Sequence, residues 1–214
     1  FHHSLDAACH LCESLAPTPG GHAAMHAPVT DSPGLQAMAG AVAARFGRCD
    51  LLVNCAGTTR YVDHSDLDAL TDALIDQILA TNVRGPFAVI RAFAPMLRKS
   101  PCALIVNISS IAAVTATGSN VMYCASKAAV DNMTRSLARA LAPAVRVLSV
   151  SPGLVDTDFV QELDERWRRE QVERTALKSL ASPGHVAAAI VAAATHLTFT
   201  TGSVLSVDGG RQLM

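Results

Sequence analysis

Three residues that can donate or accept a proton lie close together in the sequence: Ser110, Tyr123 and Lys127. Tyr123 and Lys127 are four residues apart in VMYCASKAA (121–129), so on a helix they share one face. A tyrosine has a pKa near 10 and exchanges protons poorly at neutral pH, unless a cation within about 4–6 Å stabilises its phenolate. Ser110 could hydrogen-bond a carbonyl or alcohol oxygen while Tyr123 gives or takes its proton, which is worth roughly 10²–10⁴-fold in rate.

Taken alone, a Tyr-x-x-x-Lys pair is common on ordinary helices, so its neighbours decide its meaning. Apolar runs predict strands over 23–29, 50–55, 103–108, 145–150 and 203–207. Periodic and capped segments predict helices after Ser4, over 32–46, over 66–98 with a break near Thr81 or Pro86, and over 120–142.

Strands that are apolar on both faces and alternate with helices are typical of a parallel sheet covered on both sides. We therefore expect one doubly wound α/β domain spanning 1–214, with its ligand crevice at the carboxyl ends of the strands. Asn54 to Gly57 and Asn107 to Ser110 each end a predicted strand, so they should converge with Tyr123 and Lys127. Asn107 and Ser109 could equally be hydrogen-bonding residues of the strand ends.

Composition narrows the class of partner. Half of the 214 residues are apolar, 16% are charged, and 17 Lys and Arg balance 18 Asp and Glu. No run of like charge indicates binding to nucleic acid or to an anionic membrane. The apolar stretch 186–194 is far shorter than the roughly 20 residues that span a bilayer. A small molecule is the expected ligand.

Six cysteines follow no disulfide framework and no secretory signal precedes them, which favours the cytoplasm. Cys9 and Cys12 form a single CxxC without a second pair of ligands. We expect two buried, small apolar side chains there and no metal site.

Several motifs together resemble the short-chain dehydrogenase/reductase family. Asn54-Cys55-Ala56-Gly57 is similar to its NNAG motif, and Asn82 in ATNVRGPF is similar to the asparagine of its catalytic tetrad. Ser110 lies 13 residues before Tyr123, as in the family, and YCASK resembles its YxxxK. The segments SPGLVDT (151–157) and TGSVLSVDGG (201–210) resemble its PG-x-x-x-T and TGxxxxVDGG motifs, the latter common in the 3-oxoacyl-acyl-carrier-protein reductase subgroup.

This resemblance implies a Rossmann-like fold and NAD(P)-dependent interconversion of a ketone and a secondary alcohol. Tyr123 would be the general acid/base, Ser110 would orient the substrate oxygen, and Lys127 would lower the tyrosine pKa and hold the nicotinamide ribose. Asn82 would hold a water of the proton relay. The remaining implied cofactor-binding residues are Asn54, Ala56, Gly57, Pro152, Gly153, Val155 and Thr157.

Two features depart from the family pattern. The glycine-rich TGxxxGxG turn, which cradles the pyrophosphate, is absent from the 214 residues, and we expect the first strand and this turn to be missing ahead of Phe1. Pro28 replaces the Asp that binds adenine, so only the backbone of Val29 could contact the ring. His2, His3 and Ser4 follow where the second strand would end and offer no carboxylate, which favours NADP over NAD, although NAD stays possible.

The charged segment 156–183 is expected to form a substrate lid, with Phe159, Leu163 and Trp167 as an apolar wall, or else a solvated surface helix. The leading hypothesis is a 3-oxoacyl-carrier-protein type of reductase, acting on a small carbonyl substrate that could be carrier-linked, as a homotetramer or homodimer. The alternatives are an NAD-dependent alcohol or sugar dehydrogenase of the same fold, and a truncated, non-catalytic scaffold.

Overall fold

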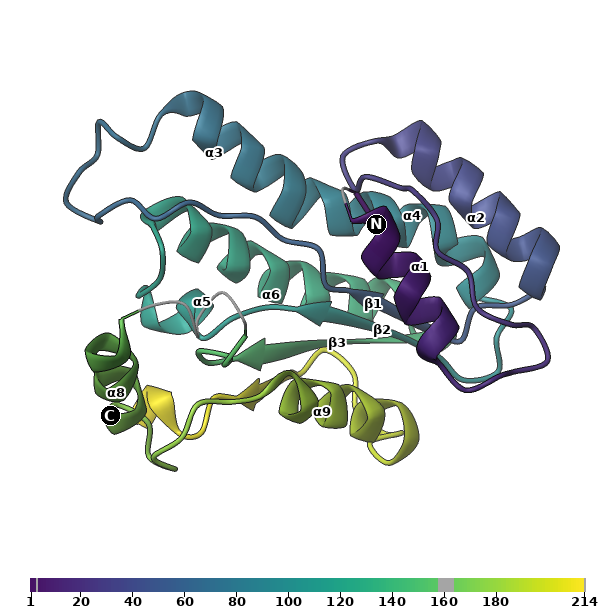
Figure 1. Cartoon of the computed structure of the whole chain (residues 1–214). Helices are drawn as coiled ribbons and strands as arrows, with labels where there is room; N and C mark the ends of the chain where they lie inside the picture. Colours follow the sequence, from purple (N-terminus) through teal and green to yellow (C-terminus); the bar gives the residue numbers. More distant parts are fainter. Residues whose placement is uncertain (3, 158–163, 214) are drawn as a thin grey trace.

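The computed structural model describes residues 1–2, 4–157 and 164–213. Its centre is a parallel sheet in the order β1-β2-β3-β4 (Figure 1). The four strands are β1 (Leu51–Asn54), β2 (Ala103–Ile108), β3 (Val145–Pro152) and β4 (Val204–Val207). β2 and β3 carry apolar side chains on both faces and are buried almost throughout, as expected for central parallel strands.

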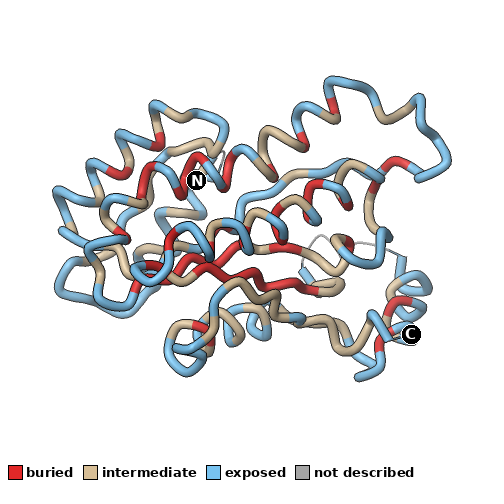
Figure 2. The backbone as a smooth tube through the Cα atoms, turned by 180° about the vertical axis from the view of Figure 1, so that it is seen from behind, coloured by how far each residue is buried: buried red, intermediate tan, exposed pale blue. Residues whose placement is uncertain are grey.

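Helices cover both faces of this sheet, which confirms the predicted doubly wound α/β architecture. On one face lie α2 (Ser32–Phe46), α4 (Gly85–Leu97) and α6 (Val121–Leu141), around a core that includes Leu35, Phe93, Ile105 and Val147. On the other, α9 (Pro183–Thr195) packs against Leu104, Val106, Leu148 and Val150. Figure 2 shows buried residues concentrated in the central strands and the inner sides of the helices.

The long helical region predicted over 66–98 is three consecutive elements. It begins only at α3 (Asp72–Leu79), where the Thr71 side chain caps the backbone N–H of Leu74. A π-helical turn, η1 (Ala80–Arg84), joins α3 to α4 and includes the predicted break at Thr81. This turn places Asn82 in the interior, facing α6.

Two expectations for the amino-terminal region are wrong, the strand over 23–29 and the burial of Cys9 and Cys12. Residues 23–29 form no strand; among the described backbone hydrogen bonds of this segment, Phe1 donates to the Met25 carbonyl and accepts from the N–H of Ala27, and Asp31 donates to the Pro28 carbonyl. The helix after Ser4, α1 (Leu5–Ser14), forms but buries no side chain; Cys9 is exposed and Cys12 is only half-buried. The strand predicted over 50–55 does form, as β1; it lies at the edge of the described sheet, and its Leu51 and Val53 side chains remain 40% and 37% exposed.

The charged segment after β3 contains α8 (Glu165–Glu173), with Trp167 37% exposed, while Phe159 and Leu163 lie outside the described residues. Arg168 Nη2 donates to Asp156 Oδ1 at 2.8 Å, and Arg211 Nη2 donates to Gln171 Oε1 at 2.6 Å. These contacts hold α8 against the segment after β3 and against the 3₁₀ turn η2 (Arg211–Leu213).

Gly209, in the turn after β4, provides a stability test of this packing. Its φ is +61°, and an added Cβ would lie 2.6 Å from Cγ2 of the buried Thr175. We expect Gly209→Ala to lower the free energy of unfolding by about 1–3 kcal/mol, measured by urea denaturation. Gly40→Ala is the matched control inside α2, because a Cβ added there would meet no described atom within 4 Å beyond its chain neighbours and the backbone of its own helix turns. This change should raise the free energy of unfolding by about 0.5–1 kcal/mol. Equal effects of the two changes would contradict the packing described.

Candidate active site

A cavity of about 320 Å³ opens at the carboxyl ends of the strands. Ser110, Tyr123 and Lys127 line it together with four of the predicted cofactor-binding residues, Gly57, Pro152, Gly153 and Val155. These residues lie at or just after the ends of β1, β2 and β3 or belong to α6, so the sheet brings together groups that are far apart in sequence. The cavity also includes Cys55, Thr58, Thr59, Ile108 and Ser109.

Tyr123 is fixed by the start of α6. Asn120 caps this helix: its Oδ1 accepts from the backbone N–H of Tyr123 at 2.7 Å, and its Nδ2 donates to the Arg60 carbonyl at 2.7 Å. Burial raises the pKa of the Tyr123 hydroxyl above its ordinary value, and hydrogen bonding with the Ser110 side chain acts in the opposite direction. The phenol is therefore protonated at neutral pH, the form that can donate a proton.

Lys127 lies one helical turn further, with only 6% of its surface exposed. Its ammonium donates to the Ile108 carbonyl at 2.8 Å and lies 5.8 Å from the centroid of the Tyr123 ring. Burial lowers the pKa of Lys127, while the charges of Cys55 and Asp131 raise it. The expected lowering of the tyrosine pKa by Lys127 stays a prediction, because in this structure burial dominates and raises the pKa of Tyr123.

The two serines at the end of β2 have different partners. Ser110 Oγ accepts from the backbone N–H of Ala112 at 3.2 Å, at the start of the short helix α5 (Ala112–Thr115), and faces the cavity. Ser109 is buried and its Oγ donates to the Lys127 carbonyl at 3.4 Å. Ser109 thus ties β2 to α6, and Ser110 is the serine placed to meet a substrate oxygen.

Asn82 lies behind the cavity and uses its amide within the protein. Oδ1 accepts from the backbone N–H of Thr58 at 2.8 Å, and Nδ2 donates to the Thr58 carbonyl at 2.9 Å and to Ser126 Oγ at 3.1 Å. Asn82 therefore clamps the loop after β1 onto α6. Its proposed part in holding a water stays a prediction.

A chain of hydrogen-bonded, buried polar side chains connects the strands and the helix that carry the site residues. Asn54 Nδ2 donates to Asn107 Oδ1 at 2.9 Å, Asn107 Nδ2 donates to Thr134 Oγ1 at 2.9 Å, and Thr134 shares a hydrogen bond of 2.8 Å with Ser149. All four are buried, and they connect β1, β2, α6 and β3. Asn54, implied as a cofactor ligand, thus has its side-chain amide turned into the protein interior.

Several implied cofactor residues lie outside this cavity. Val29 packs onto the core near Gly85, Ser4 and Ala56 are exposed, and Thr157 bonds through its N–H to the Val155 carbonyl. The His2 ring lies 6.3 Å from that of His26, and His3 is outside the described residues. Cys55 and Thr58 line the cavity but were not predicted as site residues; their position beside Gly57 is the signal that could have identified them.

The residues around the cavity fit the nicotinamide and ribose half of a dinucleotide. Gly57 presents bare backbone there, and a Cβ added to it would lie 3.8 Å from Lys127 Nζ and 3.6 Å from Asn82 Oδ1. A donor set of a phenol, an ammonium and a hydroxyl suits ribose hydroxyls and a carbonyl oxygen. Within the part of the chain that the structure describes, no group of three His, Cys, Asp or Glu side chains could hold a metal ion.

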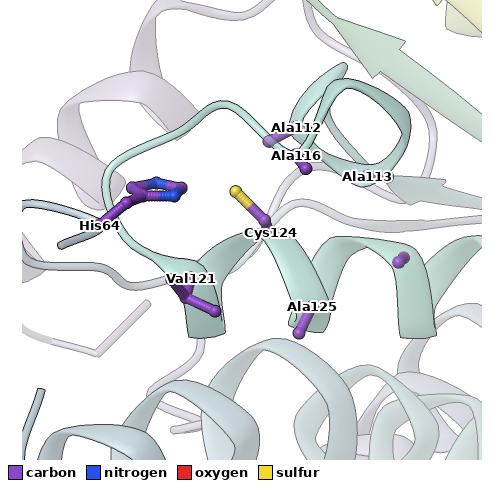
Figure 3. A pocket seen from close by; sticks show the side chains of 8 residues that line it. His64, Ala112, Ala113, Ala116, Val121, Cys124 and Ala125 are labelled. Carbon is purple, nitrogen blue, oxygen red and sulfur yellow. The ribbon is translucent and has the colours of Figure 1, made fainter. Parts of the chain in front are cut away.

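A second cavity, of about 270 Å³, lies beside α5 and α6 (Figure 3). Its walls are small and apolar, with Cys124 and His64 as the exceptions, and it contains none of the predicted catalytic residues. His64 Nε2 forms a hydrogen bond of 3.2 Å with the Gly118 carbonyl, which fixes the loop that carries it.

Comparisons with known proteins agree with this geometry. Residues 3–212 match the family model described as enoyl-(acyl carrier protein) reductase. The chain is 33% identical to the 3-oxoacyl-[acyl-carrier-protein] reductase FabG of Thermotoga maritima, over 85% of this chain and 74% of the relative. It is 34% identical to the D-threitol dehydrogenase of Mycolicibacterium smegmatis, over 94% and 77%. The solved structure of ElxO with NADP bound superposes with a TM-score of 0.80 at 27% identity, covering 87% of this chain and 76% of that one.

The chain belongs to the short-chain dehydrogenase/reductase family, and it is an NAD(P)-dependent oxidoreductase related to 3-oxoacyl-carrier-protein reductases. The sequence motifs around Ser110, Tyr123 and Lys127 therefore identified the family correctly. No helix in the described ranges is both long and apolar enough to cross a membrane.

Proposed function

We propose that this protein reduces a 3-oxoacyl ketone to the secondary alcohol, with NADPH as the reductant. The observation that carries the proposal is the convergence of Ser110, Tyr123 and Lys127 on one cavity beside Gly57 and Gly153. The relationship to 3-oxoacyl-carrier-protein reductases supports an acyl substrate, free or carrier-linked.

The proposed chemistry assigns one task to each side chain. The Ser110 hydroxyl donates a hydrogen bond to the substrate carbonyl oxygen and orients it. The Tyr123 phenol donates its proton to that oxygen as negative charge develops there. The Lys127 ammonium, 5.8 Å from the ring centroid, stabilises the phenolate that remains and would hold the ribose hydroxyls. When bound, the nicotinamide supplies the hydride.

The protonation state of Tyr123 supports the reductive direction at neutral pH. Burial raises its pKa, so the proton donor is present at pH 7 and is lost only as the pH rises through that raised value. Reduction should therefore persist into alkaline solution, whereas alcohol oxidation, which needs the phenolate, should be favoured only at higher pH.

Cofactor preference gives a direct prediction. His2 and Ser4 offer no carboxylate to a ribose 2′-hydroxyl, and the related ElxO binds NADP. We expect NADPH to bind at least about tenfold more tightly than NADH, since the 2′-phosphate adds charge-assisted hydrogen bonds. Fluorescence titration of the purified protein with each cofactor measures this; equal affinities would remove the NADP preference and leave the family assignment intact.

A substrate panel distinguishes the two enzyme classes that relatives suggest. Consumption of NADPH with a 3-oxoacyl thioester is expected, and NAD-dependent oxidation of a polyol should be slower. The reverse preference would favour the alternative, a sugar-alcohol dehydrogenase, for which the D-threitol dehydrogenase is the relevant relative.

The proposal also covers the compartment, the assembly and the segment 156–183. The protein would act in the reducing cytoplasm, consistent with six free cysteines, and would assemble as a homotetramer or homodimer. The segment 156–183 would close over the substrate, with α8 as its ordered part.

A further inference from the structure

The interior of this protein contains two opposite charges, of which the proposed mechanism gives a role to one, Lys127, and none to the other, Asp131. Among the described residues, Lys127 and Asp131 are the only charged side chains that are buried, at 6% and 4% exposure. They have opposite signs and lie four residues apart on α6, one turn from each other. Charged side chains are almost never fully buried in proteins unless they are paired.

Asp131 has no evident structural task of its own. It lies in the interior of α6, so it caps no helix end. Its Oδ1 is buried and accepts no hydrogen bond from any described residue, and no ion pair within 4 Å involves it in that part of the chain. A carboxylate in this position is costly, and an apolar side chain would pack at lower cost. The charge itself therefore needs a reason.

The buried ammonium of Lys127 is the opposite charge that a carboxylate at position 131 can balance. This ammonium has one described hydrogen-bond acceptor, the Ile108 carbonyl at 2.8 Å. This carbonyl accepts from one N–H of the ammonium but carries no negative charge to balance it. Tyr123, the uncharged Asn82 of η1 and the Ile108 carbonyl of β2 lie around this ammonium, and the charged groups that act on it are the Cys55 thiol after β1 and Asp131 on α6. Burial lowers the pKa of Lys127, and the charges of Cys55 and then Asp131 raise it; of these two, Asp131 is the one that is itself buried.

We propose that Asp131 is a positioning residue whose buried carboxylate is the counter-charge that keeps Lys127 in its ammonium form. This inference rests on the proposed role of Lys127 in stabilising the Tyr123 phenolate, because only the ammonium can do so. Asp131 does not touch the cavity and acts entirely through Lys127.

Lysine NMR tests the proposal directly. The sequence has three lysines, Lys99, Lys127 and Lys178, so protein with isotope-labelled lysine gives three side-chain signals. Lys99→Arg and Lys178→Arg assign them without altering the site. In Asp131→Asn, which keeps the shape and removes the charge, the titration midpoint of Lys127 should move to lower pH. Asp76→Asn removes the same charge from the exposed side of α3 and should leave the midpoint unchanged. An unchanged midpoint in Asp131→Asn overturns the proposal.

Turnover separates this proposal from the proposed function. In Asp131→Asn the alkaline limb of the reduction profile should move to lower pH, and Asp131→Glu should restore it in part. A wild-type protein that reduces no ketone would refute the proposed function and leave the lysine titration as the test of the charge pair. A wild-type enzyme whose pH profile and lysine midpoint are both unaffected by Asp131→Asn would refute the charge pair alone.

A thermal comparison decides the matter if Asp131→Asn does not fold. Lys127→Met leaves the buried carboxylate without its counter-charge and should lower Tm. Adding Asp131→Asn to Lys127→Met removes the uncompensated charge and should raise Tm above that of Lys127→Met alone. A lower Tm in the double variant would overturn the proposal.

Discussion

Replacing Tyr123 by Phe is expected to lower the turnover of ketone reduction by at least about 100-fold while leaving NADPH affinity nearly unchanged. The substitution removes one hydroxyl and keeps the ring that packs at the start of α6, so the helix and the cavity should persist. What is lost is the proton donor, whose protonated form burial favours through its raised pKa. Steady-state NADPH consumption and a separate NADPH titration measure the two quantities.

The sequence provides a matched control for this change. Tyr61 is the other of the two tyrosines in the sequence, lies in the loop after β1 and is 75% exposed. Tyr61→Phe removes the same hydroxyl outside the cavity and should leave turnover within about twofold of the wild type. If Tyr123→Phe and Tyr61→Phe had equal turnover, Tyr123 would have no part in the proton transfer.

Asn107→Ala is expected to lower the free energy of unfolding by about 2–4 kcal/mol. Asn107 is fully buried in β2 and links Asn54 of β1 to Thr134 of α6. Its removal leaves the Asn54 amide without an acceptor and opens a gap in a close-packed interior. Urea denaturation, followed by far-UV circular dichroism, gives the difference.

Asn132→Ala is the control for the loss of an asparagine side chain, because Asn132 lies on the exposed side of α6. Its effect should fall within about 0.5 kcal/mol. A loss in Asn107→Ala no larger than in Asn132→Ala would show that the buried polar chain contributes little to holding the strand ends together.

The parts of the fold that the sequence predicted well are those where local pattern and burial agree. The strand predicted over 103–108 is β2, and the helix predicted over 120–142 is α6 within one residue at each end. The β2 sequence is continuously apolar, and the α6 sequence is periodic and begins at the Asn120 cap. The segment 23–29 has a similar apolar composition but pairs with none of the strands that the structure describes, and composition alone cannot supply a partner.

The reacting side chains of the site could be predicted from the sequence, but the buried residues that position them could be predicted less well. Spacing placed Ser110, Tyr123 and Lys127 correctly in one cavity. It could not show that the Asn54 and Asn82 amides turn inward, since that depends on partners more than 20 residues away in sequence. Nor could it show that burial raises the pKa of Tyr123, or that Asp131 shares the interior with Lys127.

The most direct test of the proposed chemistry follows the hydride into the product. The purified protein is incubated with a 3-oxoacyl thioester and NADPH that carries deuterium at the transferred position, and the product is analysed by mass spectrometry. We predict a 3-hydroxyacyl product with one deuterium on its carbinol carbon, formed much more slowly by Tyr123→Phe. Recovery of unreduced ketone, with NADPH bound but not consumed, would contradict the proposal that this cavity reduces a carbonyl.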